Sequence, residues 1–258
     1  MATKIELALE ELALGQMLLR KGARVRAVVT VGFGNRPDVG KPGEADIVGT
    51  AFLPKLHRFN EAFSKFSDRT RVIVYPELPR GCPPHLEKPY AFKAYALEEV
   101  SRNGYDELLW ADSSVYPLRS IEPLWELIKQ QGYWFQQNGQ YTCGEWTADS
   151  ALEPLGITRA EAFTIPQIAA TCFGLDLMNS KAREFLREYY RLAQGTAFCG
   201  PWINDRQQAS TNMRVRGHRH DQTAASVIVH RLGLNITQEL FWEDYPYHKL
   251  GVMMVVHR

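Results

Sequence analysis

Short apolar runs alternate along this chain with segments of helical periodicity, and this alternation constrains the fold more than any single motif does. Apolar or β-branched runs typical of buried strands occupy residues 25–31, 71–75 and 108–111. Segments with one apolar face, typical of helices, lie at 53–66, 89–103, 121–131, 180–194 and 221–232. The pattern predicts an α/β fold in which helices flank a mostly parallel central sheet.

Four further segments complete the expected order of elements. They are a helix over 160–170 and strands over 133–136, 172–178 and 250–257. Residues 4–21 have the spacing of an amphipathic helix that Gly22 ends, so an additional N-terminal helix is expected within residues 1–22. Because neither an internal repeat nor a long linker interrupts the pattern, one domain over residues 1–258 is predicted.

Composition excludes several classes of protein. The 258 residues are 45% apolar and 11% aromatic, which is enough hydrophobic surface to offset chain entropy and excludes a disordered chain. A net charge of +1 gives no bulk attraction for nucleic acid. No apolar run reaches the roughly 18–20 residues of a membrane helix, and the N-terminus does not have the pattern of a signal peptide. Four cysteines without a C-x-x-C pair indicate a reducing, cytoplasmic setting.

The strongest local signal is a strand that ends in an acid, Asp112. Residues 108–111 are apolar throughout, and Ser113 and Ser114 follow the acid. Open α/β sheets bind ligands at the carboxyl ends of their strands, so Asp112 is predicted to face a ligand crevice. One or two carboxylates with substrate phosphates can hold Mg²⁺ or Mn²⁺. The alternative is that Asp112 only caps the following turn.

A second signal is the segment Gly-His-Arg-His-Asp-Gln at residues 217–222, directly before a predicted helix. Asp221 or Gln222 at the mouth of that helix can meet sugar hydroxyls or serve as a base. Arg219 can hold phosphate. The alternative is that His220 or Asp221 only caps the helix.

Several histidines lie close to these signals. His218 and His220 alternate in sequence, so in an extended loop their rings would point apart, which disfavours a joint metal site. The apolar run at 252–256 ends in His257, a candidate ligand, and His248 is its rival. The alternative for both is the structural role that a lone histidine usually has.

Four segments follow one another in an order that is more specific than any one of them. They are Lys-Pro-Tyr-Ala-Phe-Lys at 88–93, Leu-Trp-Ala-Asp-Ser-Ser at 109–114, the stretch 167–174, and the segment 217–222. Together they resemble the nucleotide-diphospho-sugar transferases of the GT-A fold, and more closely a group of small bacterial and phage-type glycosyltransferases. The resemblance covers about residues 25–258. It implies a GT-A-like, Rossmann-like sheet and the transfer of a hexosyl or pentosyl group from a nucleotide-diphosphate sugar.

The resemblance implies a metal-assisted site. Asp112 begins the family's Asp-x-Asp motif for metal and diphosphate, but the third position is Ser114, so one charged ligand is missing. His257, or His248 as its rival, is implied to complete a site for Mn²⁺ or Mg²⁺. Such a cation stabilises the diphosphate leaving group as a Lewis acid.

The other matching residues are implied to bind the donor and to activate the acceptor. Asp221, with Gln222, is implied to contact the donor sugar or to take the proton of the acceptor hydroxyl. The further implied contacts are Lys93, Ser113, Gly174, Arg219 and His220. Among these, Gly174 matches a stretch that lines the acceptor and the sugar.

Three functions remain open from the sequence. The first is transfer to a saccharide hydroxyl. The second is a phage-type enzyme that glycosylates a flipped hydroxymethylated base in DNA, which is motivated by Trp202 and the arginines at 206, 214, 216 and 219. The third is a degenerate, non-catalytic domain that binds sugar nucleotides, which is motivated by Ser114.

Overall fold

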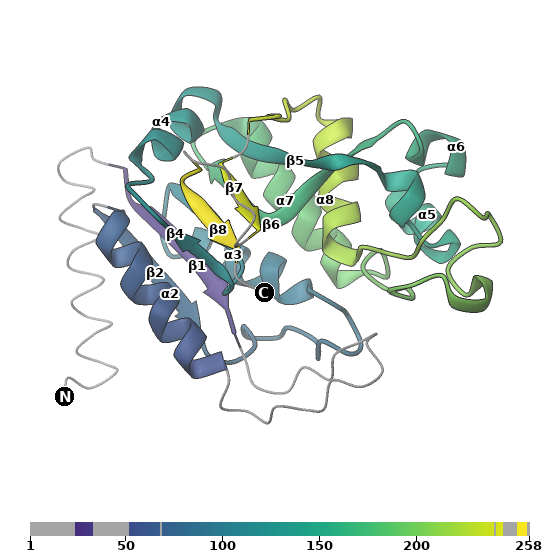
Figure 1. Ribbon diagram of the computed structural model, residues 1–258, viewed down its shortest axis with the longest axis horizontal. Helices are drawn as coiled ribbons and strands as arrows, with labels where there is room; N and C mark the ends of the chain where they lie inside the picture. The colour runs from purple at the N-terminus through teal and green to yellow at the C-terminus, as the bar shows by residue number, and fades with distance from the viewer. Residues whose placement is uncertain (1–23, 33–51, 68, 240, 245–251, 257–258) are drawn as a thin grey trace.

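The computed structural model describes residues 24–32, 52–67, 69–239, 241–244 and 252–256, with the backbone alone at 52–54 (Figure 1). The helix expected over residues 4–21 lies outside the described residues. The prediction of a single domain over the whole chain stays a prediction.

The centre of the fold is a five-stranded sheet in the order β2-β1-β3-β6-β5. Its strands are β1 (Arg26–Val31), β2 (Thr70–Tyr75), β3 (Glu107–Ala111), β5 (Tyr133–Thr142) and β6 (Pro166–Asp176). β1 pairs in parallel with both β2 and β3, whereas β6 runs antiparallel to β3 and to β5. Four strands therefore share one direction and β6 opposes them, which confirms the predicted mostly parallel sheet.

Helices cover both faces of this sheet. One face carries α3 (Ala91–Arg102), α7 (Ser180–Gln194) and α8 (His220–Arg231). The other face carries α2 (Phe52–Phe66), α4 (Glu122–Gln131) and a small second sheet of β4 (Val115–Pro117), β8 (Met254–Val256) and β7 (Trp242–Asp244). This arrangement of layers agrees with the alternation of strands and helices in the sequence.

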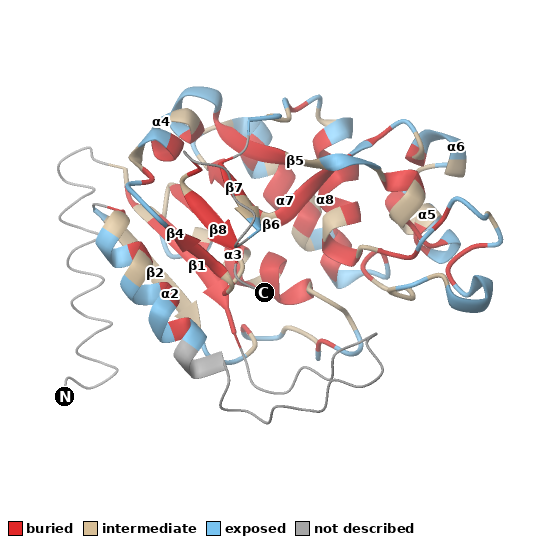
Figure 2. Ribbon diagram, in the orientation of Figure 1, coloured by how far each residue is buried: buried red, intermediate tan, exposed pale blue. Residues whose placement is uncertain are grey.

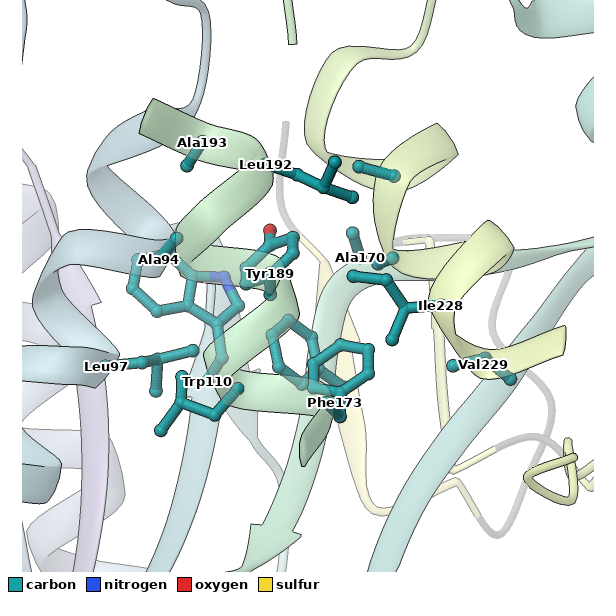
Figure 3. Close-up of a cluster of buried hydrophobic side chains, with 14 of the residues drawn as sticks. Ala94, Leu97, Trp110, Ala170, Phe173, Tyr189, Leu192, Ala193, Ile228 and Val229 are labelled. Atoms are coloured by element: carbon teal, nitrogen blue, oxygen red, sulfur yellow. The ribbon is translucent and has the colours of Figure 1, made fainter. Parts of the chain in front are cut away.

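The strands supply side chains to two separate cores. Trp110 and Phe173 pack with α3, α7 and α8, whereas Val28 and Leu109 pack with α2 and α4. Figure 2 shows the central strands as a buried layer between helices that are exposed on their outer sides. Trp110, Phe173 and Tyr189 lie together in the first core (Figure 3). Because both faces are covered, β3 is buried at every position.

The helix predicted over residues 160–170 is wrong. The structure has only one helical turn there, α6 (Arg159–Ala162), and β6 begins at Pro166. Proline has no backbone N–H, so it suits the first residue of a strand and not the interior of a helix. Most of the residues that follow are buried in the sheet, so tertiary packing overrides their alanine-rich composition. The further short elements are η1 (Cys143–Trp146), α5 (Asp149–Leu155) and η2 (Asp205–Gln207).

No helix in the described part of the chain is both long enough and apolar enough to cross a membrane. All four cysteines lie within the described ranges and are free thiols, as the absence of a disulfide pattern led us to expect. The cytoplasmic location stays a prediction.

Candidate active site

Asp112 lies directly after β3, where the chain turns into β4. Its backbone N–H donates to the carbonyl of Thr171 at 2.9 Å, and its own carbonyl accepts from the N–H of Val115 at 2.8 Å. The side chain of Asp112 is 31% exposed. Ser113 is buried and Ser114 is half-buried in the same turn. Asp112 therefore presents a partly open carboxylate at the edge where open α/β sheets bind ligands.

Lys93 joins Asp112 to Asp221. It lies in the first turn of α3, and its Nζ is 2.9 Å from Oδ1 of Asp112 and 2.9 Å from Oδ2 of Asp221. The same ammonium donates to the carbonyl of Ala170 in β6 at 2.9 Å. The indole N–H of Trp110 donates to Oδ1 of Asp112 at 2.9 Å. We call Lys93, Asp112 and Asp221 the Lys93 cluster.

The Lys93 cluster places two negative charges and one positive charge in a largely buried setting. The side chains of Lys93 and Asp221 are only 4% and 6% exposed. Burial alone would lower the pKa of Lys93, but the charges of Asp112 and Asp221 outweigh it and raise that pKa. Burial raises the pKa of Asp221, and the charge of Lys93 offsets this only in part. A carboxylate with a raised pKa is a better base than an exposed one.

Aromatic side chains stand beside this cluster. They form what we call the aromatic wall, which consists of Tyr90, Trp146, Trp202 and His220. The ring of Tyr90 is centred 5.3 Å from Nζ of Lys93 and 5.9 Å from the ring of His220. Both Tyr90 and His220 have left-handed backbones, with φ of 61° and 39°. Such conformations cost about 1–3 kcal/mol each and are frequent at ligand sites.

Arg219 adds a positive charge to the aromatic wall. Its guanidinium carbon lies 4.1 Å from the centre of the Trp146 ring and 4.4 Å from that of Trp202. The His220 ring stacks on Trp202 at 5.2 Å. Contacts of a guanidinium with aromatic faces are favourable and restrict its motion. The wall therefore holds a cation at a defined place next to the start of α8.

The prediction that His218 and His220 point apart is wrong. Their ring centres are 5.0 Å from each other, because His220 begins α8 with a positive φ and does not continue an extended loop. Nε2 of His218 lies 3.0 Å from the carbonyl of Ala197, and Nδ1 of His220 lies 2.8 Å from that of Phe198. Burial lowers the pKa of His218 to about 3 and that of His220 to about 4, so both rings are neutral donors to these carbonyls.

Gln222 and Gly174, two more of the predicted site residues, lie at different distances from the cluster. Oε1 of Gln222 accepts from the backbone N–H of Ala170 at 3.4 Å, which ties α8 to β6 beside the Lys93 cluster. Gly174 is buried further along β6, where a Cβ atom would lie 2.3 Å from Cδ1 of Ile128. This position favours a packing role for Gly174, which lets α4 approach the sheet closely.

The described residues fit a divalent cation poorly. Oδ1 of Asp112 already bonds an indole N–H and the Lys93 ammonium, and a cation bound to that oxygen would be repelled by the ammonium. Among the described side chains, no three His, Cys, Asp or Glu residues gather as metal ligands. His257 and His248 lie outside the described ranges. The metal set of Asp112, Ser114 and His257 therefore stays a prediction.

Sequence reasoning missed the bond from Trp110 and the aromatic wall. Trp110 lies near the end of β3 and Asp112 follows that strand directly, and residues two apart in an extended chain share a face, so a signal for the indole contact was available. Trp146 and Trp202 lie far apart in the sequence in segments without clear periodicity. Nothing in the sequence pattern indicates that their rings enclose Arg219.

No protein-family model matches the chain, and a search of curated proteins finds no match. The chain is similar to the crystal structure of a glycosyltransferase involved in the glycosylation of the major capsid of PBCV-1, with a TM-score of 0.53 and 14% identity over 90% of this chain and 93% of that one. Mouse xyloside xylosyltransferase 1, in its apo form, aligns with a TM-score of 0.48 and 9% identity over 91% and 98% of the two chains. The first likeness confirms the expected GT-A-like fold.

Proposed function

We propose that this protein transfers a sugar from a nucleotide-diphosphate sugar to a hydroxyl acceptor. One observation carries the proposal: Asp112 and Asp221 come from distant parts of the sequence and meet at the Lys93 ammonium. Their meeting point lies at the carboxyl end of β3, where open α/β sheets bind ligands. The GT-A-like fold supports the same function.

Asp221 is proposed to act on the acceptor. In an inverting transfer, the acceptor oxygen forms a bond to the anomeric carbon while the bond from that carbon to the diphosphate oxygen breaks. The hydroxyl proton passes to the carboxylate of Asp221, and the electron pair of the broken bond leaves with the diphosphate. In a retaining transfer, Asp221 would orient the donor sugar instead. Lys93 touches neither reacting atom in this scheme and acts as a positioning residue.

The leaving diphosphate is proposed to bind near the aromatic wall. Its developing negative charge needs fixed hydrogen-bond donors or positive groups, which stabilise charge best when they are held in place beforehand. Arg219 supplies such a group, since two indole rings fix its guanidinium. Ser113 and Ser114 follow Asp112 and are proposed to donate to the phosphates from the same edge. Assistance by Mn²⁺ or Mg²⁺ stays a prediction that rests on the resemblance.

A saccharide hydroxyl is proposed as the acceptor in preference to DNA. The guanidinium of Arg214 lies 3.8 Å from the centre of the Phe163 ring, and Arg216 pairs with Glu145 at 3.3 Å. Part of the basic segment therefore makes contacts within the protein. A shift assay over a range of salt concentrations tests the alternative, because binding to DNA phosphates must weaken steeply as salt rises.

The first test is a thermal-shift screen of the full chain with nucleoside diphosphates and nucleotide sugars. A ligand that binds only the folded protein raises its melting temperature by mass action. Hydrolysis of the stabilising donor in the absence of an acceptor then tests for catalysis. If no nucleotide sugar stabilises or reacts with the protein, the proposal is wrong; stabilisation without turnover would favour the non-catalytic binding domain.

The second test separates Asp221 from carboxylates elsewhere. Asp221→Asn should lower donor turnover by about 10²–10⁴-fold, which is the usual contribution of a general base. Glu153→Gln makes the same chemical change at an exposed position in α5 and should leave turnover unaltered. An Asp221→Asn protein that folds and retains full turnover would exclude Asp221 as the base.

A further inference from the structure

The ammonium of Lys93 sits where three oxygens from three elements converge. Oδ1 of Asp112, Oδ2 of Asp221 and the carbonyl oxygen of Ala170 each lie 2.9 Å from Nζ. These oxygens belong to the turn after β3, to the first turn of α8 and to β6. The ring of Trp110, centred 5.5 Å from Nζ, closes another side of the ammonium.

Carboxylate and carbonyl oxygens are the ligands that hard divalent cations prefer. An ammonium group carries three N–H donors, and here three protein oxygens are within reach of them. The convergence of oxygens is therefore a cation site of the kind a divalent metal would use, and the side chain of Lys93 fills it. The repulsion between like charges disfavours a metal ion on the same oxygens.

The chain around Lys93 holds the ammonium in this place. The backbone N–H of Tyr90, just before α3, donates to Nδ1 of His85 at 3.1 Å, which fixes the start of the helix. Gln222 bonds the backbone N–H of Ala170, the residue whose carbonyl accepts from Lys93. The side chain of Lys93 is 4% exposed, so the ammonium is shielded from solvent among these oxygens.

We propose that the Lys93 ammonium permanently occupies this cation site, so that no divalent cation binds at Asp112 while Lys93 is present. Removal of the Lys93 side chain then creates a divalent cation site. The inference deepens the proposed function, on which its meaning for catalysis rests: sugar transfer then proceeds with Lys93 in the place of a metal at the carboxylates. The binding test below does not depend on that activity.

The experiment measures Mn²⁺ binding to the full chain, which includes His257 and His248, by electron paramagnetic resonance and calorimetry. Wild-type protein and Asp112→Asn should bind Mn²⁺ equally weakly. Lys93→Ala should gain one site that binds at least about tenfold more tightly, and adding Asp112→Asn to it should remove that gain, since even the loss of a group that only orients a metal ligand typically costs about 10–100-fold in affinity. Lys129→Ala, at an exposed position in α4, should behave as wild type.

One result overturns the proposal outright: stoichiometric Mn²⁺ binding by wild-type protein that Asp112→Asn weakens. This comparison retains Lys93 in both proteins, so it decides even if Lys93→Ala fails to fold. A folded Lys93→Ala protein that gains no Mn²⁺ site would contradict the second half of the proposal.

Activity is measured separately with a chelator. If a nucleotide sugar is turned over, removal of divalent cations should leave the rate within about twofold, whereas an enzyme that depends on a metal as Lewis acid would lose most of its turnover. If no nucleotide sugar reacts, glycosyl transfer fails as the proposed function, but the Mn²⁺ comparison still decides which cation occupies the cluster.

Discussion

The two ends of β3 both carry acidic groups with basic partners, but the charges are matched differently. At the start of the strand, Glu107 is fully buried and bonds Arg24 at 2.9 Å and Arg26 at 2.8 Å. Arg24 also pairs with the buried Asp176. Two guanidinium groups thus serve two buried carboxylates, and Arg26 extends the network to the partly exposed Glu122 at 2.7 Å.

At the other end of β3, a single ammonium serves two carboxylates. Lys93 contacts both Asp112 and Asp221, and Asp112 remains 31% exposed. Arg219 and the aromatic wall stand nearby. At the Glu107 end each buried carboxylate has a guanidinium partner, whereas at the Asp112 end two carboxylates share one ammonium, and the partly exposed one lies near a guanidinium held by two indole rings, which is an arrangement that a polar substrate can complete. We therefore propose that the Glu107 end serves stability and that the Asp112 end binds the ligand.

The largest effect is expected from removing the one cation at the Asp112 end. Lys93→Met should lower the free energy of unfolding by about 3–5 kcal/mol, because it leaves a buried carboxylate without its partner. Lys129→Met, at an exposed position in α4, should change it by less than about 0.5 kcal/mol. Urea unfolding measures both. A Lys93→Met protein as stable as wild type would show that Asp221 is not held as an ion pair.

A pair of variants at the two ends of β3 tests the comparison directly. Glu107→Gln should cost about 1–3 kcal/mol of stability, since buried hydrogen bonds to charged partners are weakened. It should leave the affinity for a nucleotide sugar unchanged. Asp112→Asn should do the reverse, with a larger loss in donor affinity than in stability. Unfolding and calorimetry on both proteins check this; equal losses of affinity would remove the distinction between the two ends.

Gly174→Ala tests whether Gly174 belongs to the donor site or only to the packing of the core. The new methyl group would lie 2.3 Å from Cδ1 of the buried Ile128, and such overpacking costs about 1–3 kcal/mol. Donor affinity should not change, because Gly174 packs beneath α4. Gly195→Ala is the matched control, since its Cβ would meet only the carbonyl of Leu192 at 3.6 Å. Loss of donor affinity with full stability would instead support the contact with sugar that the sequence implied.

Local signals explain which elements could be predicted from the sequence. The helix expected over 180–194 is α7 with the same bounds, and Asn179 caps it by accepting from the N–H groups of Lys181 and Ala182. The helix expected over 160–170 fails because burial in a sheet decides the conformation of that alanine-rich stretch, and Pro166 was the local warning. A capped and strongly amphipathic helix such as α7 can thus be read from the sequence, whereas a stretch whose conformation is decided by packing in the sheet cannot.

The candidate site likewise has some residues that local sequence signals reveal and some contacts that only tertiary packing creates. Asp112 and Asp221 stand out in the sequence because one ends an apolar strand and the other begins a helix. That Lys93 forms ion pairs with both could not be read from any spacing, because the pairs depend on how α3, β3 and α8 pack together. The enclosure of Arg219 by Trp146 and Trp202 is tertiary for the same reason.

The smallest predicted effect concerns the pH dependence of stability. It again tests the end of the molecule that carries the candidate site, through His218. Burial, and then the neighbouring His220, lower the pKa of His218 to about 3 in the folded protein, whereas an unfolded histidine titrates near 6.5. Below pH 6.5 the unfolded chain binds a proton at His218 that the folded protein does not bind. The free energy of unfolding therefore falls, by about 1–2 kcal/mol down to pH 5.

His218→Gln should lose correspondingly less stability between pH 7 and pH 5 than wild type does. His230→Gln, at an exposed position in α8, should retain the wild-type slope. Urea unfolding at the two pH values measures the difference, and an unchanged slope in His218→Gln would mean that the ring accepts a proton without leaving its place beside Ala197.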